Sequence, residues 1–334
     1  MKKLIYDERI EFPGEIPAAV RVYKAAHYPA HYHNDALEII ICLEGSAELC
    51  ACYESRHLTQ GSIYSIDPMD PHYIYSDEDN LLLSFYIDIT NLKTDEDLIR
   101  KCFFACEEIE MNDITIEAMY NIQDIITSVA FLLTGSGGQD SSPAGTVCSV
   151  REDRADCSDT VAEYTNRVMD YMIKYFDWLS FIPDPYYTNR NFRARFLTIM
   201  DYCHENYREK ISVSQLARMV HVNENYLSAF MKKTSFGGFK ECINFIRCFM
   251  AENLLLTTDQ NVVEISSICG FSDPKYFYAA FRKWWQCSPA QLRRKYREYG
   301  SLPADFEIYD NKKAFAALKE FMPYYSLQKL RDFR

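Results

Sequence analysis

One helical plan occurs twice between residues 212 and 286, and it restricts this part of the chain to paired short helices. In its first occurrence Ser212 precedes VSQLARMV, and Gln215 follows three residues later, a spacing that is typical of a capping box. This helix is expected to end at His221, and Asn223 is expected to cap a second helix, ENYLSAFMKK. Two helices joined by a turn of three or four residues predict a helix-turn-helix unit.

The second occurrence has the same order of helices, and its capping and turn residues are clearer. Asn261 precedes VVEISSICG, and Glu264 stands three residues later. Gly270 supplies a turn residue that tolerates positive φ. Asp273 is expected to cap PKYFYAAFRKWW, with Pro274 at the first helical position, where its missing N–H costs nothing.

Charge supports a nucleic-acid partner for this part of the chain alone. The whole chain carries 36 basic and 48 acidic side chains, whereas residues 190–298 carry 17 basic and 10 acidic ones. The segment is therefore net positive on an acidic protein, which favours a polyanionic partner. A recognition helix fits the major groove of DNA while basic side chains and helix N-termini contact phosphates.

Residues 190–297 resemble the DNA-binding domain of the AraC/XylS family of bacterial transcription regulators. The match is densest at ISSICGFSDPKYFYAAFRK, and Ser288, Pro289 and Arg293 follow it. The resemblance implies base contacts by residues of the two recognition helices, namely Asn225, Ser228, Ala229, Pro274, Lys275, Tyr278 and Ala279. It implies phosphate contacts by the basic residues that follow them, namely Lys232, Lys233, Arg282 and Lys283.

Four positions depart from the family pattern. Ala229 and Ala279 stand where the family often has Arg, so fewer direct base contacts are expected. Phe236 and Gln286 stand where a Gly commonly follows each recognition helix, which leaves the geometry of the two helix ends open.

The first 90 residues predict an antiparallel β-barrel. Short runs rich in β-branched and aromatic residues, separated by turn residues, are expected to form strands at 38–43, 46–52, 62–66 and 81–87. Apolar residues then recur at helical period at 116–133 and 161–179, and Thr94 is expected to cap a helix over 97–106. The predicted fold class is α+β: a barrel with flanking helices, followed by an all-α domain with two helix-turn-helix units.

The predicted domains follow from these patterns. They are a sensor barrel at 1–90, a helical connecting region at 91–185, the DNA-binding domain at 190–298 and a C-terminal extension at 299–334. The glycine-rich stretch 134–159 is expected to be a flexible loop, Pro183 and Pro185 mark a linker, and the extension is expected to contain an amphipathic helix. The helices of the connecting region are a candidate dimer surface, with packing inside the domain as the alternative.

The barrel sequence also resembles the two cupin motifs. His31, His33 and Glu38 match the first spacing, and Gly61 followed by His72 matches the second, although Asp67 and Met69 stand where cupins prefer Pro and Gly. The resemblance implies that the three His and the Glu meet inside the barrel and can hold a divalent metal such as Zn, Mn or Fe. The alternative is a wet effector pocket without tight metal, which is the expectation here, formed by His31, Tyr32, His33, Glu38, Tyr64 and His72.

These patterns predict a ligand-responsive transcription regulator that binds double-stranded DNA as a homodimer and senses a small metabolite, for which a sugar is one candidate. No G-x-S-x-G, P-loop or G-x-G-x-x-G motif is present, so no enzyme is expected. The start of the chain has no secretory signal, and the twelve cysteines form no C-x-x-C pair, which together predict a cytoplasmic protein. Two alternatives stay open: a cupin metalloenzyme with a DNA-binding tail, and a constitutive DNA-binding regulator whose barrel is only structural.

Overall fold

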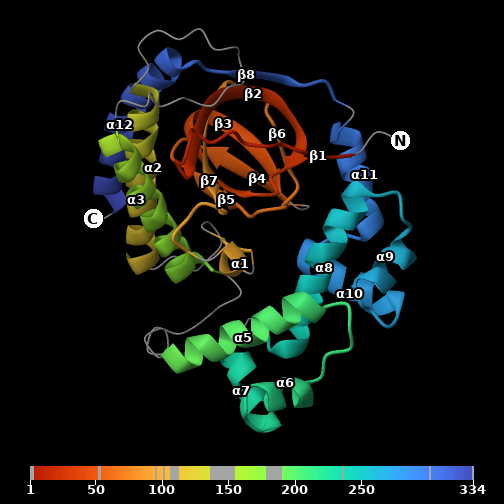
Figure 1. The fold of residues 1–334 in the computed structure, drawn as a ribbon. Coiled ribbons are helices and arrows are strands. Elements are labelled where there is room, and N and C mark those ends of the chain that lie inside the picture. Colours follow the sequence, from red (N-terminus) through yellow and green to blue (C-terminus); the bar gives the residue numbers. More distant parts are fainter. Residues whose placement is uncertain are drawn as a thin grey trace. The chain divides into compact units, whose positions relative to one another are not determined.

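The computed structural model divides by contacts into two units, which are described separately (Figure 1). The barrel unit comprises 6–99, 104–176 and 300–334, and the helical unit comprises 1–5, 100–103 and 177–299. The residues described are 4–51, 54–94, 96–100, 102–105, 113–135, 155–177, 190–234, 237–300 and 302–332.

Two long strands organise the barrel unit, β2 (Ala18–Tyr32) and β3 (Ala36–Ala51). Both β6 (His72–Tyr75) and β7 (Asn80–Asp88) pair antiparallel with β2 and with β3, so the sheet closes into a barrel (Figure 1). The remaining strands of this part lie at its margins: β1 (Tyr6–Asp7) beside β2, and β4 (Glu54–Thr59) and β5 (Ile63–Ile66) beside β3. The predicted barrel is confirmed.

The strand boundaries differ from the expected ones in an instructive way. The runs expected at 38–43 and 46–52 belong to one strand, β3, as far as residue 51, where the described part ends, and Gly45 lies within this strand. Gly45 has a φ of 69°, and a Cβ there would lie 1.9 Å from the carbonyl oxygen of Asp79. Only glycine fits this approach, so the residue marks a close approach within a strand instead of a turn between two strands.

Helices accompany the barrel in the same unit. α2 (Asp113–Gly135) packs on α3 (Ala155–Tyr171), which continues into a π-helical turn, η1 (Met172–Phe176). These helices correspond to the two periodic segments at 116–133 and 161–179. They also include both ends of the predicted flexible loop 134–159, whose central part, 136–154, lies outside the described residues, as do Pro183 and Pro185.

The helix expected at 97–106 is wrong. Among the described residues of this range only α1 (Glu96–Ile99) is helical, and residues 102–105 are not. The backbone N–H of Phe104 donates to both carboxylate oxygens of Asp67, at 3.0 and 3.1 Å, instead of to a helical carbonyl. A distant carboxylate therefore replaces the local hydrogen bond that helix propagation needs.

The C-terminal segment belongs to the barrel unit. β8 (Asp305–Ile308), which was not predicted, pairs antiparallel with β2, and α12 (Asn311–Asp332) packs on α2. Phe315 of α12 meets Phe131 of α2 edge-on, with 5.3 Å between ring centroids. The helix expected in this extension is present, and the strand before it adds to the sheet.

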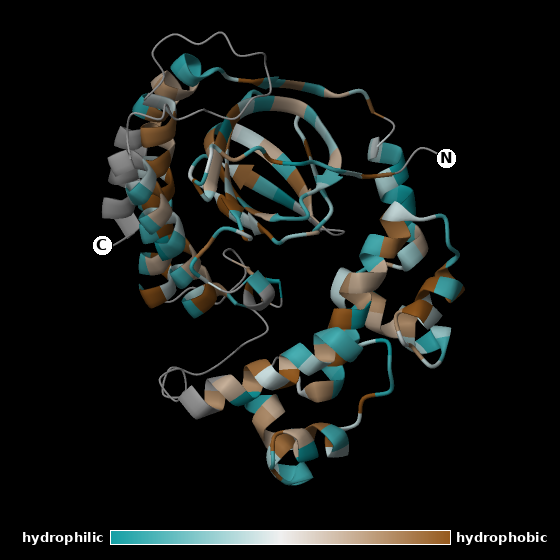
Figure 2. Ribbon diagram, viewed as in Figure 1, coloured by the Kyte–Doolittle hydropathy of each residue, from teal (hydrophilic) through white to brown (hydrophobic). Residues whose placement is uncertain are grey.

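The described residues of the helical unit form seven helices, which bury apolar side chains; Figure 2 shows the hydropathy along them. They are α5 (Arg190–Asn206), α6 (Val213–Met219), α7 (Glu224–Thr234), α8 (Phe239–Thr257), α9 (Val262–Ile268), α10 (Pro274–Trp285) and α11 (Pro289–Gly300). The pairs α6–α7 and α9–α10 are the two predicted helix-turn-helix units, with α8 as the connecting helix.

Local side chains set the helix starts as the sequence predicts. The Asn261 side chain accepts from Glu264 N–H, and the Glu264 side chain accepts from Asn261 N–H, which completes a capping box. Ser212 likewise accepts from Gln215 N–H, but the Gln215 side chain donates to the Tyr202 hydroxyl, so the reciprocal bond of the first box is replaced by a tertiary contact.

One aromatic residue reaches the core of the helical unit from outside the predicted domain 190–298. Phe103 is buried there, edge-on to Phe245 and Phe249 with 4.9 Å between ring centroids in each case. Eight cysteines with described side chains are buried. No helix among the described residues has both the length and the apolar character that crossing a membrane requires.

Candidate functional site

The exposed face of α7 carries the residues predicted to contact bases in the first unit. Asn225, Ser228 and Ala229 are exposed, while Leu227 and Phe230 point into the core. A spacing of three and four residues places the exposed three on one face of the helix. Lys232 and Lys233 follow on the exposed side of the last turn.

The exposed face of α10 is arranged in the same way and is more basic. Lys275, Tyr278 and Ala279 are exposed and Pro274 is half-buried at the helix start, while Phe277 packs inward. Asp273 caps the helix by accepting from the N–H of Lys275 at 2.8 Å.

The two cations near the end of α10 differ in their surroundings. Arg282 and Lys283 are both exposed, but Lys283 Nζ lies 2.5 Å from a carboxylate oxygen of Glu241 on α8. A phosphate would have to compete with Glu241 for Lys283. In this respect Arg282 is better placed than Lys283 to contact a DNA phosphate.

At the end of α10, Gln286 stands where a glycine commonly follows the recognition helix in the AraC/XylS family. Gln286 itself takes the left-handed conformation, with φ of 53°, and its side-chain amide donates to the carbonyl of Lys283 at 3.0 Å. That bond satisfies one of the carbonyls left free at a helix C-terminus. The corresponding Phe236 after α7 lies outside the described residues.

Two arginines brace the helix ends of the helical unit. Arg247 of α8 donates to the carbonyls of Tyr207 and Glu209 after α5, at 2.7 and 2.8 Å. Arg293 of α11 donates in the same manner to the carbonyls of Leu255 and Gln260 at the end of α8 and beyond it. Each helix-turn-helix unit therefore has a fixed frame on which its recognition helix is presented.

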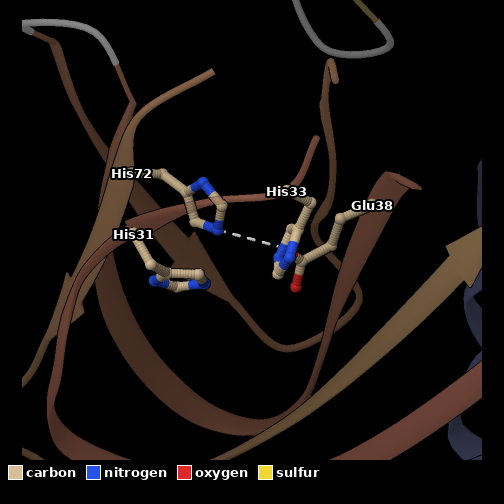
Figure 3. A group of neighbouring side chains, drawn as sticks. All are labelled: His31, His33, Glu38 and His72. Atoms are coloured by element: carbon tan, nitrogen blue, oxygen red, sulfur yellow. Dashed lines mark hydrogen bonds and ion pairs between the residues drawn. The ribbon is translucent and has the colours of Figure 1, made fainter. Parts of the chain in front are cut away.

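A second candidate site lies inside the barrel, where the structure brings His31, His33, Glu38 and His72 together (Figure 3). The four residues come from the end of β2, the turn after it, β3 and β6. One ligand atom from each lies within 4.8 Å of all the others, and all four side chains are buried.

Backbone carbonyls fix the orientation of the three imidazoles. The Nδ1 atoms of His31, His33 and His72 lie 2.8, 2.8 and 2.9 Å from the carbonyl oxygens of Pro29, Glu8 and Asp70, respectively. A carbonyl only accepts, so each Nδ1 carries a proton, and a ring that is neutral presents a bare Nε2 to the cluster, whereas His33 needs a second proton on Nε2 to donate to Glu38.

The electrostatics of the cluster centre on Glu38. Its Oε2 lies 3.0 Å from His33 Nε2 and 3.1 Å from His72 Nε2. Burial disfavours the carboxylate charge, but the approach of the two histidines outweighs it and holds the pKa of Glu38 well below its usual range. Burial also opposes charge on His33, yet the hydrogen bond to Glu38 raises the pKa of His33.

His31 behaves differently from His33. Burial, together with the neighbouring His72 and His33, lowers the pKa of His31 well below its usual value, so this ring is neutral. The cluster thus combines an ionised carboxylate with at least one neutral imidazole whose Nε2 offers a lone pair. Such a donor set suits a divalent transition metal.

Beside the histidines lies a polar network that sequence reasoning missed. Glu8, just after β1, accepts from Arg21 Nη1 at 3.1 Å and from the Tyr28 hydroxyl at 2.7 Å. Arg21 is buried in β2, and its Nη1 also lies 3.4 Å from the Tyr86 hydroxyl. The available signal was an arginine between apolar neighbours at the start of β2, in the run AAVRVY, since a buried charge needs a partner.

The other two residues predicted for the pocket lie apart from this arrangement. Tyr32 is half-buried and follows His31 directly in β2, so its side chain points to the opposite face of the strand. Tyr64 of β5 packs against the apolar core of the barrel.

The residues of the cluster fit a divalent metal on an observation independent of the motif. His72 Nε2 is buried and has no hydrogen-bond partner, because its approach to Glu38 lacks hydrogen-bond geometry. A buried acceptor without a donor is costly, and a cation would satisfy it together with the other three groups. His31, His33, His72 and Glu38 would be the ligands of such an ion.

Comparisons with known proteins agree with this division. The chain matches the family model of an AraC-like ligand binding domain over residues 13–95 and that of a helix-turn-helix domain over residues 216–295. The uncharacterized HTH-type transcriptional regulator YijO of Escherichia coli (strain K12) is 38% identical over 104 residues, which are 31% of this chain and 37% of that protein.

Other relatives match over a similar part. The lactose operon transcription activator of Staphylococcus xylosus is 29% identical, over 29% of this chain and 35% of that protein. The melibiose operon regulatory protein of Escherichia coli (strain K12) is 27% identical, over 29% and 32%. The chain thus matches about a third of the length of these curated relatives.

Two solved structures extend the comparison. The C-terminal domain of the two-component response regulator yesN from Fusobacterium nucleatum is 32% identical, covers 30% of this chain and 98% of that chain, and has a TM-score of 0.28. ToxT from Vibrio cholerae is 15% identical, covers 83% of this chain and 98% of that chain, and has a TM-score of 0.39.

Proposed function

We propose that this chain, which carries an AraC-like ligand binding domain and an AraC-type helix-turn-helix domain, is a ligand-responsive regulator that binds double-stranded DNA. The observation that carries the proposal is the matched exposure of α7 and α10. Each presents its predicted base-contacting residues on one face of a helix whose opposite face is buried. This is the arrangement of a recognition helix in the major groove.

The barrel is the proposed effector site. Its buried cluster of three imidazoles and a carboxylate offers donors and acceptors to a polar small molecule. The printed names of two relatives, a lactose operon activator and a melibiose operon regulator, support a sugar as the class of effector. We propose further that the protein acts in the cytoplasm as a homodimer and is not an enzyme.

DNA binding is tested with the full chain by selection from a random duplex library. The expected result is one site per protomer with two recognised segments about one helical turn, roughly 34 Å, apart. The selected duplex should bind less tightly as salt rises, because basic side chains release counterions from phosphates. Recovery of a single short segment, or of no preferred sequence, would reject the two-helix model.

Effector binding is tested by thermal unfolding in the presence of lactose, melibiose and their component monosaccharides. A sugar that binds only the native state raises the melting temperature. Glu38→Gln should abolish this rise, while Glu48→Gln, which alters the exposed pair with His57, should keep it. A rise that survives Glu38→Gln would place the effector outside the cluster, and a DNA affinity indifferent to a bound sugar would favour the constitutive regulator.

The His–Glu cluster also favours a second candidate, a cupin metalloenzyme joined to a DNA-binding domain. An enzyme of this kind needs a bound metal with an open coordination position. Metal analysis of the purified protein, followed by a search for turnover, separates this candidate from the regulator.

A further inference from the structure

We propose that Glu8 is a fifth ligand of the divalent-cation site formed by His31, His33, Glu38 and His72. Glu8 lies outside both cupin-like motifs, in the segment before the barrel's long strands. The proposal rests on the fit of a metal to the four-residue cluster and is independent of DNA binding.

The first observation is a second buried acceptor without a donor. Glu8 Oε2 is buried and has no hydrogen-bond partner, as is true of His72 Nε2. Glu8 Oε2 lies 3.2 Å from His31 Nε2, whose lone pair faces it because the His31 proton is on Nδ1. Two acceptors at this distance repel each other unless a cation lies between them.

Glu8 lies outside the group of four whose ligand atoms are all within 4.8 Å of one another, and its contact with that group, through His31, has nearly the same length as the contacts within it. The contacts His33 Nε2–Glu38 Oε2, His72 Nε2–Glu38 Oε2 and His31 Nε2–Glu8 Oε2 measure 3.0, 3.1 and 3.2 Å. Two atoms bound to one ion at about 2.1 Å each, at right angles, lie about 3.0 Å apart. Glu8 reaches the cluster through His31, so the ion is expected to draw its carboxylate inward.

The neighbours of Glu8 hold its carboxylate as the outer partners of a metal ligand do. Arg21 and Tyr28 both donate to Oε1, which leaves Oε2 for the cluster. The main-chain carbonyl of Glu8 also accepts from His33 Nδ1 and so fixes the orientation of another ligand. One residue would therefore serve as a ligand through its side chain and as an outer partner through its backbone.

The donor set points to a class of cation. Three imidazoles and two carboxylates exceed the four ligands of a structural zinc site. Mixed nitrogen and oxygen ligands in this number suit Mn²⁺ or Fe²⁺, which accept five or six donors. Glu8 would thus shift the preference of the site away from Zn²⁺.

The test uses the full chain, freed of metal by a chelator, and the cations Mn²⁺, Zn²⁺ and Co²⁺ as separate probes. Glu8→Gln should weaken Mn²⁺ binding at least about tenfold, the lower range for lost partners of a metal site, and weaken Zn²⁺ binding less. The visible absorption of bound Co²⁺ should become stronger in the variant, because intensity rises as coordination number falls. Glu11→Gln removes an exposed carboxylate from the same segment and should match the wild type.

Equal Mn²⁺ affinity and equal Co²⁺ spectra in Glu8→Gln and the wild type would overturn the proposal, as would a wild-type chain that binds none of the three ions. If Glu8→Gln does not fold, Glu8→Asp serves instead, because it keeps the charge beside Arg21 but withdraws the carboxylate by one methylene. Glu8→Asp should likewise lose Mn²⁺ affinity relative to Zn²⁺, and an unchanged ratio would count against Glu8 as a ligand.

Discussion

The polar residues of the barrel cluster and those of the recognition helices are held in opposite ways. In the cluster each imidazole is oriented by a carbonyl and Glu38 is shared between two rings, all out of contact with water. On α7 and α10 the polar residues stand side by side in solvent. The cluster should therefore respond to substitution as a unit, and the recognition helices residue by residue.

The largest effect is expected where the groups depend on one another. Glu38→Ala removes the carboxylate that His33 and His72 share, and we expect the affinity for Zn²⁺ or Mn²⁺ to fall more than about 100-fold, beyond the loss caused by outer partners. Competition with a chromophoric chelator measures this. The exposed His57–Glu48 pair is the control, and a smaller loss in Glu38→Ala than in Glu48→Ala would show that the cluster is not the metal site.

A smaller and more local effect is expected on α10. Lys275→Ala or Tyr278→Ala should cost about 1–3 kcal/mol of DNA-binding free energy if the lost group contacts a base, and should relax sequence preference in one segment only. Binding to a set of duplexes mutated at single positions measures this. A uniform loss over the whole set would reassign the residue to the DNA backbone.

Lys232 on α7 should show a still smaller effect of a different kind. Lys232→Ala should weaken binding to all sequences alike and reduce the slope of log affinity against log salt by about 1. Titrations at several salt concentrations measure the slope. Lys210→Ala, at an exposed lysine outside the recognition helices, is the control and should leave the slope unchanged.

The smallest expected effect is the interaction free energy between substitutions on the two recognition helices. The free-energy costs of Asn225→Ala and Lys275→Ala should add within about 0.5 kcal/mol, because the residues lie on separate helices without shared partners in the contacts described. The double variant and both single variants, measured on one duplex, give this value. A larger interaction would show that DNA couples the two helices, and the contrast with the buried cluster would then disappear.

The helical unit could be predicted in detail because its signals are local. Asn261 with Glu264, Asp273 with Pro274 and the turn at Gly270 each act within a few residues, and the structure uses every one of them. Gly270 also permits a close approach to a distant segment, since a Cβ there would lie 2.6 Å from the carbonyl oxygens of Tyr207 and Arg208 after α5.

The barrel was predicted where apolar runs mark strands and where motif spacing marks the cluster, and its remaining parts were missed. The four-residue cluster follows from the separations along the chain, but β2, β8 and the role of Glu8 depend on partners far away in sequence. Glu8 contacts Arg21 and Tyr28 because β1 pairs with β2, and the residues next to Glu8 in sequence do not indicate this contact. The helix expected at 97–106 was wrong for the same reason, because Asp67, far away in sequence, accepts the hydrogen bond from the N–H of Phe104.

The pairing of β8 with β2 has a consequence for biosynthesis. The ribosome completes the helical unit, up to residue 299, before it makes the strand that lies against Tyr23, Lys24 and Ala25. Domains generally fold as units while the chain emerges. The helix-turn-helix units can therefore be finished while the sheet of the barrel still lacks one of its strands, and a nascent chain would acquire its proposed DNA-binding surface before that sheet is complete.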